Sequence, residues 1–313
     1  MLLLTVIAAR VNREGIKMTV GSLISLFHDH YMMTNLAPNT YRGYMTNINN
    51  HILPYHADLD PDRLAYADVD QLVAELHRKG LKNKTINYVL ATYRKALNFG
   101  IRRGYISRNI ILSYDKPRNE VYYPEIYDAD QITQLLTIES DSAMYPAVFL
   151  ACTCGVRRGE AAGLKNEDVK RDRICIRRTV SYDHGLKVTP CKNRRQRVIL
   201  IDPDISERLQ RYDRERPQNV DGWFIRKADG SNVNPNSITK HFHKLRKRIG
   251  LPHIRFHDLR HSYATLMMEN DVHPKTVQQI LGHSSVKVTL DLYSHASVNQ
   301  QQAALNVIKK IKK

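Results

Sequence analysis

Two histidines, an arginine and a tyrosine near the C-terminal end combine side chains that could hold and attack a phosphate. His257 and Arg260 lie in H-D-L-R-H-S-Y-A-T-L, and His283 and Tyr293 lie in L-G-H-S-S-V-K-V-T-L-D-L-Y-S-H. A guanidinium binds phosphate oxygens through paired donors, imidazoles donate or transfer protons, and a phenol can act as nucleophile. The set predicts phosphate chemistry that proceeds without a metal ion.

Two upstream segments could complete such a site. In G-V-R-R-G-E, Arg157 falls at the expected start of a helix, where free N–H groups favour an anion, and Glu160 follows on the same face. Taken alone, this segment is explained more simply by a surface ion pair. The turn C-K-N-R-R-Q-R is expected at the tip of a β-hairpin, with the cations Lys192, Arg194, Arg195 and Arg197. Cations on one tip repel each other, so they either face solvent or receive an anion.

Hydrophobic spacing predicts that the N-terminal part of the chain is helical. Apolar residues recur at helical intervals from Met18 to Ile110, and prolines and glycines divide this region. The expected helices run over 19–33, from Pro38 to a stop at Pro54, from Asp68 to a stop at Gly80, and from Thr85 to Gly104. They indicate a small helical bundle over 18–112, preceded by a tail of residues 1–17.

A second domain is predicted over 129–313. Residues 113–128 contain two prolines and little periodicity, which is typical of a linker. The second domain is expected to be mainly helical, with a small three-stranded antiparallel sheet whose strands lie at 174–180, 187–190 and 197–201. Residues 300–313 alternate apolar side chains with lysines, as in an amphipathic helix that needs a partner surface.

The charge balance points to a polyanionic partner. The chain has 48 Lys and Arg against 31 Asp and Glu, a net charge of +17, and such an excess suits nucleic acid. The candidate DNA contacts are Lys82, Lys84 and Arg94 in the last helix of the bundle, and Lys240 and Lys244 in a helix over 236–249. The alternative for the first group is a helix face whose charges are merely solvated.

Other sequence features exclude several classes of protein. The 4 cysteines form no C-x-x-C pair, which favours a reducing, cytoplasmic compartment. The apolar start of the chain is shorter than the roughly 20 residues that a membrane-spanning helix needs, and it lacks the basic segment of a signal peptide. Dinucleotide-binding, Walker and zinc-protease motifs are absent from the sequence. We therefore expect neither a metal nor a cofactor.

The order of these segments resembles the tyrosine recombinase (phage integrase) family, most closely the integrases of phages and conjugative transposons. The resemblance rests on G-V-R-x-x-E, a hairpin lysine, H-x-x-R, G-H and a tyrosine ten residues after that histidine, and it covers nearly the whole chain from Met18. P-N-T-Y-R-G-Y, N-H-I-L-P and K-N-K-T-I-N-Y resemble the family's helical, SAM-like core-binding domain. The resemblance implies a site-specific DNA recombinase that integrates or excises a mobile element.

The resemblance also implies a role for each matching residue. The catalytic positions correspond to Arg157, Lys192, His257, Arg260, His283 and Tyr293, and the family's acidic position corresponds to Glu160. The arginines would clamp the non-bridging phosphate oxygens, and the lysine would protonate the departing 5′ oxygen. The histidines would bond the phosphate and assist proton transfer, the tyrosine would form a 3′-phosphotyrosine, and the glutamate would orient the site.

By the same resemblance, the chain would act on double-stranded DNA as a homotetramer, with an excision factor or a host DNA-bending factor as candidate partners. The tail 300–313 is expected to pack on a neighbouring subunit. Two features depart from the family pattern. Cys154 replaces the usual threonine before the first motif glycine. Only residues 1–17 precede the bundle, so we expect arm-site binding to be lacking or an N-terminal domain to have been lost.

Three other functions share part of this pattern. A metal-dependent transposase or nuclease would need clustered carboxylates, and the candidate site has only Glu160. A catalytically silent DNA-binding regulator would keep the recombinase fold without cleavage. A type IB topoisomerase-like enzyme would share the chemistry but relax DNA without pairing two sites. Activity in EDTA, a covalent adduct and site preference distinguish these functions.

Overall fold

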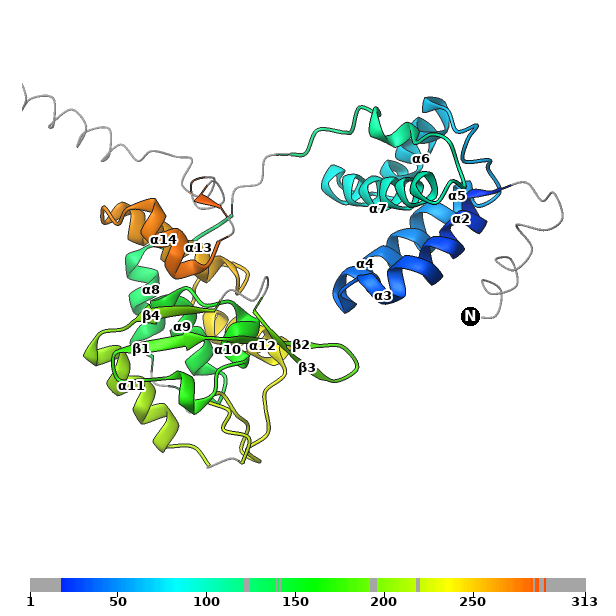
Figure 1. Cartoon of the computed structure of the whole chain (residues 1–313). Helices are drawn as coiled ribbons and strands as arrows, with labels where there is room; N and C mark the ends of the chain where they lie inside the picture. Colours follow the sequence, from blue (N-terminus) through cyan, green and yellow to red (C-terminus); the bar gives the residue numbers. More distant parts are fainter. Residues whose placement is uncertain are drawn as a thin grey trace, which may run out of the picture. The chain divides into compact units, whose positions relative to one another are not determined.

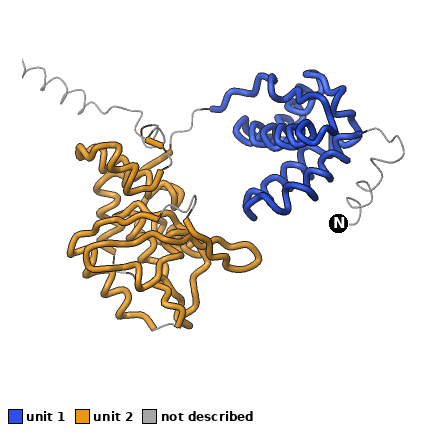
Figure 2. The backbone as a smooth tube through the Cα atoms, viewed as in Figure 1, with its two compact units in different colours: residues 1–122 blue, residues 123–313 orange. Residues whose placement is uncertain are grey.

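A computed structural model of the chain describes residues 18–120, 124–138, 140, 142–191, 196–217, 220–283, 285, 286 and 290. The chain divides into two compact units, Met1–Tyr122 and Tyr123–Lys313, which Figure 2 shows in blue and orange. The predicted features that lie outside the described residues are Lys192, Arg194, Arg195, Tyr293 and the segments 1–17 and 300–313. Within the described part, no helix is both long and apolar enough to cross a membrane.

The first unit is helical (Figure 1). Its elements are α2 (Val20–Phe27), η1 (His28–Met32), α3 (Met33–Asn35), α4 (Pro38–Asn47), η2 (Ile48–Ile52), α5 (Leu53–His56), α6 (Tyr66–Arg78), α7 (Asn83–Arg102) and η3 (Ile110–Leu112). The elements α2, η1 and α3 follow one another without a break, as do α4, η2 and α5. The longer helical stretches therefore match the helical bundle that hydrophobic spacing predicts.

The second helical stretch does not stop at Pro54, contrary to the prediction. A proline lacks the N–H donor and its ring crowds the preceding turn of an α-helix. Here the π turn η2 comes directly before it, and the Leu53 N–H bonds to the Ile48 carbonyl. The wider i→i+5 turn accommodates the proline at the start of α5, so the helix continues to His56.

The core of the first unit is built around α7. Its inward face carries apolar side chains that are fully buried, namely Ile86, Val89, Leu90, Tyr93 and Leu97. These are the residues that helical spacing places on one side. The helix packs against α2, α4 and η2, and a buried hydrogen bond of 2.8 Å from Asn47 Nδ2 to Thr92 Oγ1 fixes its register.

The segment predicted as a linker is attached at both ends. Asn83 Nδ2 and Asn87 Nδ2 of α7 donate to the carbonyls of Arg118 and Pro117, at 2.7 and 2.8 Å. Tyr127 is fully buried in the second unit, where its N–H donates to Ser262 Oγ at 2.9 Å. Side-chain amides thus hold the early part of the segment on the first unit.

The second unit surrounds α9, a helix that is apolar on every side. Its helices are α8 (Ala129–Leu136), α9 (Tyr145–Cys154), α10 (Arg158–Ala162), η4 (Asn166–Asp168), α11 (Pro203–Arg214), α12 (Pro235–Arg248), α13 (Asp258–Glu269) and α14 (Pro274–Leu281). Residues 145–152 are all buried, as expected of a helix at the centre of a core. The helices α8, α10, α11, α12 and α13 all contact it.

Within the described residues, the expected three-stranded sheet is instead two separate antiparallel pairs of strands. The strands are β1 (Arg173–Ile176), β2 (Arg178–Tyr182), β3 (Leu186–Pro190) and β4 (Arg197–Leu200), with β1 paired to β4 and β2 to β3. The strand predicted over 174–180 is broken at Arg177. Successive side chains of a regular strand point to opposite faces, but Arg177 and Arg178 both pair with Asp168, at 3.3 and 2.7 Å. The backbone must depart from strand geometry to allow this.

Two glycines bring α10 directly against β2. A Cβ at Gly159 would lie 2.7 Å from the Val180 carbonyl oxygen, and one at Gly163 would lie 2.9 Å from the Arg178 carbonyl oxygen. Both distances are shorter than real Cβ contacts, so the packing requires glycine at each position. The segment G-E-A-A-G therefore fixes α10, and the residue just before it, on the strands.

Candidate active site

Arg157 and Glu160 form a closed cap at the start of α10. Arg157 is the N-cap residue, and its backbone N–H donates to Glu160 Oε2 at 2.8 Å. Its Nη1 donates to Glu160 Oε1 at 2.7 Å. Glu160 is 4% exposed, whereas the Arg157 side chain is 39% exposed. The buried carboxylate therefore orients a guanidinium that still reaches the surface.

Arg197 also binds Glu160, although the sequence places it among the cations of the hairpin tip. The strand predicted over 197–201 is the correct placement: Arg197 is the first residue of β4, and its side chain is only 10% exposed, so it does not belong to a solvent-facing tip. Its Nη1 and Nη2 donate to the two Glu160 oxygens at 2.9 and 2.7 Å. Period-2 alternation could have predicted this, because Arg197 shares its face of the strand with the buried Ile199 and Ile201.

Glu160 is held ionised by these contacts. Burial alone would raise its pKa, but the hydrogen bonds and charge of Arg197, and then the charge of Arg157, lower the pKa of Glu160 to about 2. A carboxylate that accepts charge-assisted hydrogen bonds strongly prefers its ionised form. The glutamate therefore acts as a fixed negative charge between two guanidiniums at any ordinary pH.

Arg260 lies at the junction of two helix ends. It is 1% exposed, and its Nη1 donates to the Gly155 carbonyl at 2.7 Å while its Nη2 donates to the Leu281 carbonyl. These carbonyls belong to the C-terminal ends of α9 and α14, where the helix dipole favours a cation. Among the described residues, its buried Nε–H has no hydrogen-bond acceptor. A buried donor without a partner is costly, so an acceptor that bound at this atom would stabilise the site.

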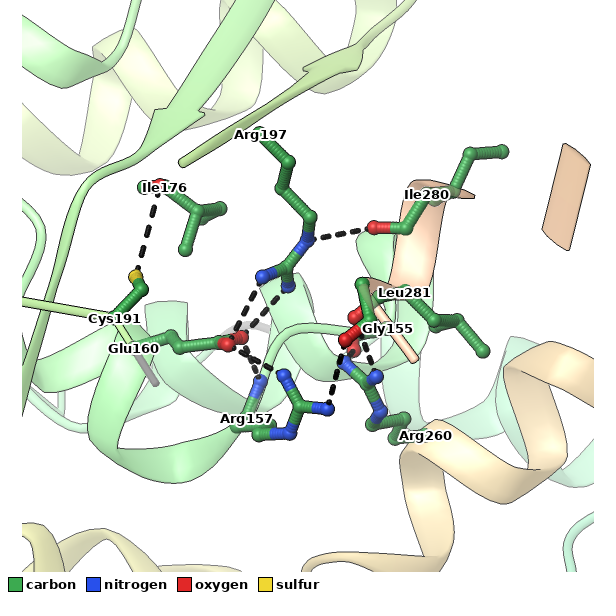
Figure 3. A network of polar contacts seen from close by, with 10 residues as sticks. Gly155, Arg157, Glu160, Ile176, Cys191, Arg197, Arg260, Ile280 and Leu281 are labelled. Carbon is green, nitrogen blue, oxygen red and sulfur yellow. Dashed lines mark hydrogen bonds and ion pairs between the residues drawn. The ribbon is translucent and has the colours of Figure 1, made fainter. Parts of the chain in front are cut away.

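Three guanidiniums converge on the last turn of α14 (Figure 3). Arg197 Nε donates to the Ile280 carbonyl at 2.7 Å, Arg260 donates to Leu281, and Arg157 Nη2 lies 3.4 Å from the Gly282 carbonyl oxygen. Carbonyls at the end of a helix lack partners within it. Gly282 ends α14 with a φ of 65°, a left-handed conformation that glycine readily adopts. This turn places His283 directly beside the arginines.

His283 and His257 are held neutral beside these cations. His283 is 7% exposed, and burial followed by the charges of Arg260 and Arg157 lowers its pKa to about 3. Desolvation, then His261, Arg260 and Arg157, lowers the pKa of His257 to about 4. The His257 ring meets the His261 ring edge to face at 4.9 Å. Near neutral pH, both imidazoles are therefore uncharged, and each can donate one hydrogen bond and accept another.

The structure brings together five of the predicted site residues: Arg157, Glu160, His257, Arg260 and His283. Lys192 and Tyr293 lie outside the described residues. Lys192 comes directly after Cys191, the residue that follows β3, and the described chain resumes at Gln196. No cluster of three or more potential metal ligands occurs in the described ranges.

The predicted DNA contacts lie on helices of both units. Lys82 and Lys84 are exposed at the start of α7, and Arg94 is half-buried further along this helix. Lys240 and Lys244 are exposed on α12, one helical turn apart. The helix α12 is held to α10 by a hydrogen bond of 2.9 Å from Arg158 Nη1 to Thr239 Oγ1. The exposed lysines of α12 are thus fixed relative to the helix that Arg157 caps.

The charges in this cluster do not balance. Arg157, Arg197 and Arg260 contribute +3, Glu160 contributes −1, and the neutral histidines contribute nothing, so the described residues carry +2 (3 − 1). A buried excess of charge is costly unless a counterion joins it. A phosphodiester supplies one negative charge, and a second develops when an oxyanion attacks it. The arrangement is suited to phosphate binding and phosphoryl transfer.

Comparison with known proteins matches both units to described families. Residues 125–300 match the "Phage integrase family", and residues 24–104 match "Phage integrase, N-terminal SAM-like domain". The tyrosine recombinase XerC of Syntrophus aciditrophicus is 25% identical over 302 residues, which cover 88% of this chain and 93% of that protein. The ICEBs1 integrase of Bacillus subtilis is 23% identical over 283 residues, covering 85% and 76%.

Solved structures share the fold. The Tn1549 transposon integrase in complex with transposon right end DNA matches 93% of this chain and 100% of its own, with a TM-score of 0.80 and 20% identity. A lambda integrase tetramer bound to a Holliday junction matches 93% of this chain and 80% of its own, with a TM-score of 0.69 and 17% identity. At such identities, the similarity shows a common architecture for the two units.

Proposed function

The chain belongs to the phage integrase family, whose members are site-specific tyrosine recombinases, and we propose that it integrates or excises a mobile DNA element through a 3′-phosphotyrosine intermediate. One observation carries this proposal. Arg157 and the unpaired Nε–H of Arg260 converge beside two neutral histidines, in a cluster with an excess of positive charge. A DNA phosphate supplies both the missing acceptor and the missing charge.

In the proposed reaction, the arginines bind the non-bridging oxygens of the scissile phosphate. The Tyr293 oxygen attacks phosphorus, so that the Tyr293 O–P bond forms and the P–O5′ bond breaks. His257 or His283 accepts the phenol proton, and Lys192 gives a proton to the departing 5′ oxygen. The 5′ hydroxyl of the partner strand then attacks the phosphotyrosine and reverses these steps. The phosphodiester energy is kept in the protein–DNA bond, so rejoining needs no nucleotide triphosphate.

Activation of the phenol needs both the cations and a base. An unperturbed phenol has a pKa near ~10, so it needs nearby cations and a base to become reactive. A neutral imidazole has the free nitrogen that takes up the phenol proton, whereas a protonated one has none. The negative charge of a bound phosphate would offset the nearby arginines and raise the low pKa values of both histidines toward this task. Fixed guanidiniums stabilise the charge that develops on the phosphate oxygens. The proposed site therefore works without a metal ion.

Both units would contact the DNA duplex. Lys82, Lys84 and Arg94 of the first unit, and Lys240 and Lys244 of the second, are proposed to contact DNA phosphates, each contact releasing counterions. We also propose that the chain acts in the cytoplasm as a homotetramer on two recombination sites. An excision factor or a host DNA-bending factor is a further proposed partner. A lambda integrase tetramer of the same fold on a Holliday junction supports the tetramer.

The tail 300–313 is proposed to contact a neighbouring subunit. An apolar hollow of about 370 Å³ lies on the second unit. Its lining includes Leu136, Leu200, Ile205, Leu266 and Met267. The alternating apolar residues of the tail fit such a surface. Deleting the tail should abolish pairing of two sites while leaving DNA binding intact, and full recombination by the truncated protein would contradict this.

A nicked suicide substrate made from the ends of the element tests the proposed chemistry. Its nick lets the cleaved strand diffuse away, so a covalent protein–DNA adduct accumulates. The wild-type protein should form this adduct in EDTA, and Tyr293→Phe should form none while binding DNA normally. An adduct with Tyr293→Phe would overturn the nucleophile, and loss of activity in EDTA would indicate a metal-dependent nuclease. Binding without any adduct would indicate a silent regulator, and relaxation without site preference a topoisomerase.

A further inference from the structure

Arg197 uses every part of its guanidinium to join three elements of the second unit. Its Nη1 and Nη2 bind Glu160 of α10 at 2.9 and 2.7 Å, and its Nε binds the Ile280 carbonyl of α14 at 2.7 Å. It starts β4, and its side chain is 10% exposed. Each guanidinium nitrogen donates one of these bonds and the charge is buried beside Glu160, so this arginine has little freedom to bind a phosphate directly.

The geometry of Glu160 shows what Arg197 controls. A carboxylate can take an arginine in a two-pronged pair, which is its strongest arrangement. Here Arg197 forms that pair, whereas the Arg157 side chain reaches Glu160 through Nη1 alone. Without Arg197, both carboxylate oxygens could chelate Arg157. The Arg157 side chain would then be drawn toward the buried glutamate and away from its surface position.

Arg197 also fixes the end of α14. Gly282 packs against it, because a Cβ at Gly282 would lie 3.1 Å from Arg197 Cδ. The Ile280 carbonyl that Arg197 binds lies in the same turn as the carbonyls that Arg260 and Arg157 contact. Displacing this turn by 1 Å would shift both phosphate-binding arginines and His283.

We propose that Arg197 is a positioning residue for the recombinase: it occupies Glu160 so that Arg157 stays turned toward the DNA phosphate, and it holds the α14 turn that precedes His283. This inference rests on the proposed function, since it concerns how the same site reaches its working geometry. It assigns Arg197 no contact with DNA.

A second ion cluster in the same unit provides a matched control. Arg178 is also a strand arginine with a largely buried side chain, and it also binds a buried carboxylate, Asp168, at 2.7 Å. Its other ion pair is with Glu167 at 3.0 Å. Among the described residues, it forms no hydrogen bond or ion pair with Arg157, Arg260 or the α14 turn. Replacing Arg178 by lysine therefore reproduces the loss of a buried arginine pair without disturbing the site.

The test compares Arg197→Lys with Arg178→Lys in single-turnover cleavage of the nicked suicide substrate. Rates are measured at saturating protein, below the unfolding temperature of both variants, with DNA affinity measured separately. Arg197→Lys should bind DNA within about 2-fold of wild type and form the adduct about 10²-fold more slowly, the scale of a 1 Å misplacement. Arg178→Lys should unfold at a lower temperature but cleave at the wild-type rate.

A double variant shows whether Arg197 acts through Arg157. If it does, the slowing in Arg157→Lys combined with Arg197→Lys should be smaller than the product of the two single effects, because one group that Arg197 positions is already lost. Any slowing beyond Arg157→Lys alone then measures the contribution of the α14 turn. Multiplied losses, or an Arg197→Lys protein as fast as Arg178→Lys, would overturn the proposal. If the wild-type protein forms no adduct at all, the proposed function fails, and that result is separate from these comparisons.

Discussion

Two buried carboxylates of the second unit make similar local contacts but lie in clusters of different net charge. Glu160 and Asp168 are each the third residue of a short helix. Each accepts a hydrogen bond from the backbone N–H of the residue that precedes the helix, Arg157 at 2.8 Å and Lys165 at 3.0 Å. Each also binds two arginines, at least one of them from a strand. Both clusters therefore have the same local arrangement, in which a carboxylate near the start of a helix accepts a backbone N–H and binds two arginines.

Charge balance separates the two clusters. Arg177 and Arg178 face Asp168 and the neighbouring Glu167, so two cations meet two anions and the net charge is 0 (2 − 2). The Glu160 cluster, with Arg157, Arg197 and Arg260, retains +2. A balanced cluster is complete within the protein, whereas an unbalanced one needs an anion from outside. We infer that net charge, rather than the number of ion pairs, distinguishes a binding site from a structural cluster.

The largest effect should come from Arg260, the most buried cation of the unbalanced cluster. In Arg260→Lys, a single ammonium cannot reach the Gly155 and Leu281 carbonyls and a phosphate together. We expect cleavage of the suicide substrate to slow by about 10³-fold, the scale of losing one donor to a developing oxyanion. Cleavage within a few-fold of wild type, by a folded protein, would show that the added anion does not bind there.

Paired amide substitutions compare the two carboxylates directly. Glu160→Gln leaves Arg157 and Arg197 without their anion, and Asp168→Asn leaves Arg177 and Arg178 with only the exposed Glu167. Each change breaks a buried ion pair and should lower the free energy of unfolding by about 3 kcal/mol. Only Glu160→Gln should also slow cleavage, by about 10- to 100-fold, because it reorients Arg157. Urea unfolding measures the first effect and single-turnover cleavage the second. Equal slowing by Asp168→Asn would remove the distinction between the clusters.

Acid should weaken the Glu160 cluster in a defined pH range. The folded-state pKa of Glu160 is lowered to about 2 from an ordinary value of 4.5. Its ionised form therefore stabilises the fold above pH 4.5, and this contribution, about 3 kcal/mol, is lost as the pH falls toward 2. In unfolding titrations between pH 6 and 3, Glu160→Gln should show a smaller loss of stability than wild type. Parallel curves for the two proteins would contradict this.

The smallest effects should come from exposed cations that belong to neither cluster. Lys240→Gln and Lys244→Gln should each weaken DNA binding uniformly across sequences and reduce the slope of log affinity against log salt by about 1. Arg173→Gln is a suitable control, because Arg173 is exposed but already pairs with Asp172. Salt titrations of DNA binding measure all three. Unchanged slopes would place the duplex elsewhere on the unit.

The sequence predicts those parts of the site that lie close together in the chain. His257 and Arg260 share one helix start, and the glycine before His283 ends a helix as expected. It does not predict the partners of Arg260, since the Gly155 carbonyl is separated from it by 105 residues. The sequence predicts Arg197 both as the first residue of a strand and as a cation of the hairpin tip, and the alternation within that strand indicates that its side chain is buried. Local periodicity does not determine which distant residues pair or where a strand begins and ends.

The distance along the chain between Arg260 and Gly155 has a consequence for protein synthesis. The first unit is complete at Tyr122 and holds its own core, so it can fold while the ribosome is still making the second. The arginine cluster needs carbonyls from both Gly155 and Leu281, so it cannot assemble until nearly the whole chain has emerged. On the proposed function, a prematurely terminated product could occupy a DNA site but could not break it. If that function is correct, the order of translation would keep incomplete copies of the protein from nicking DNA.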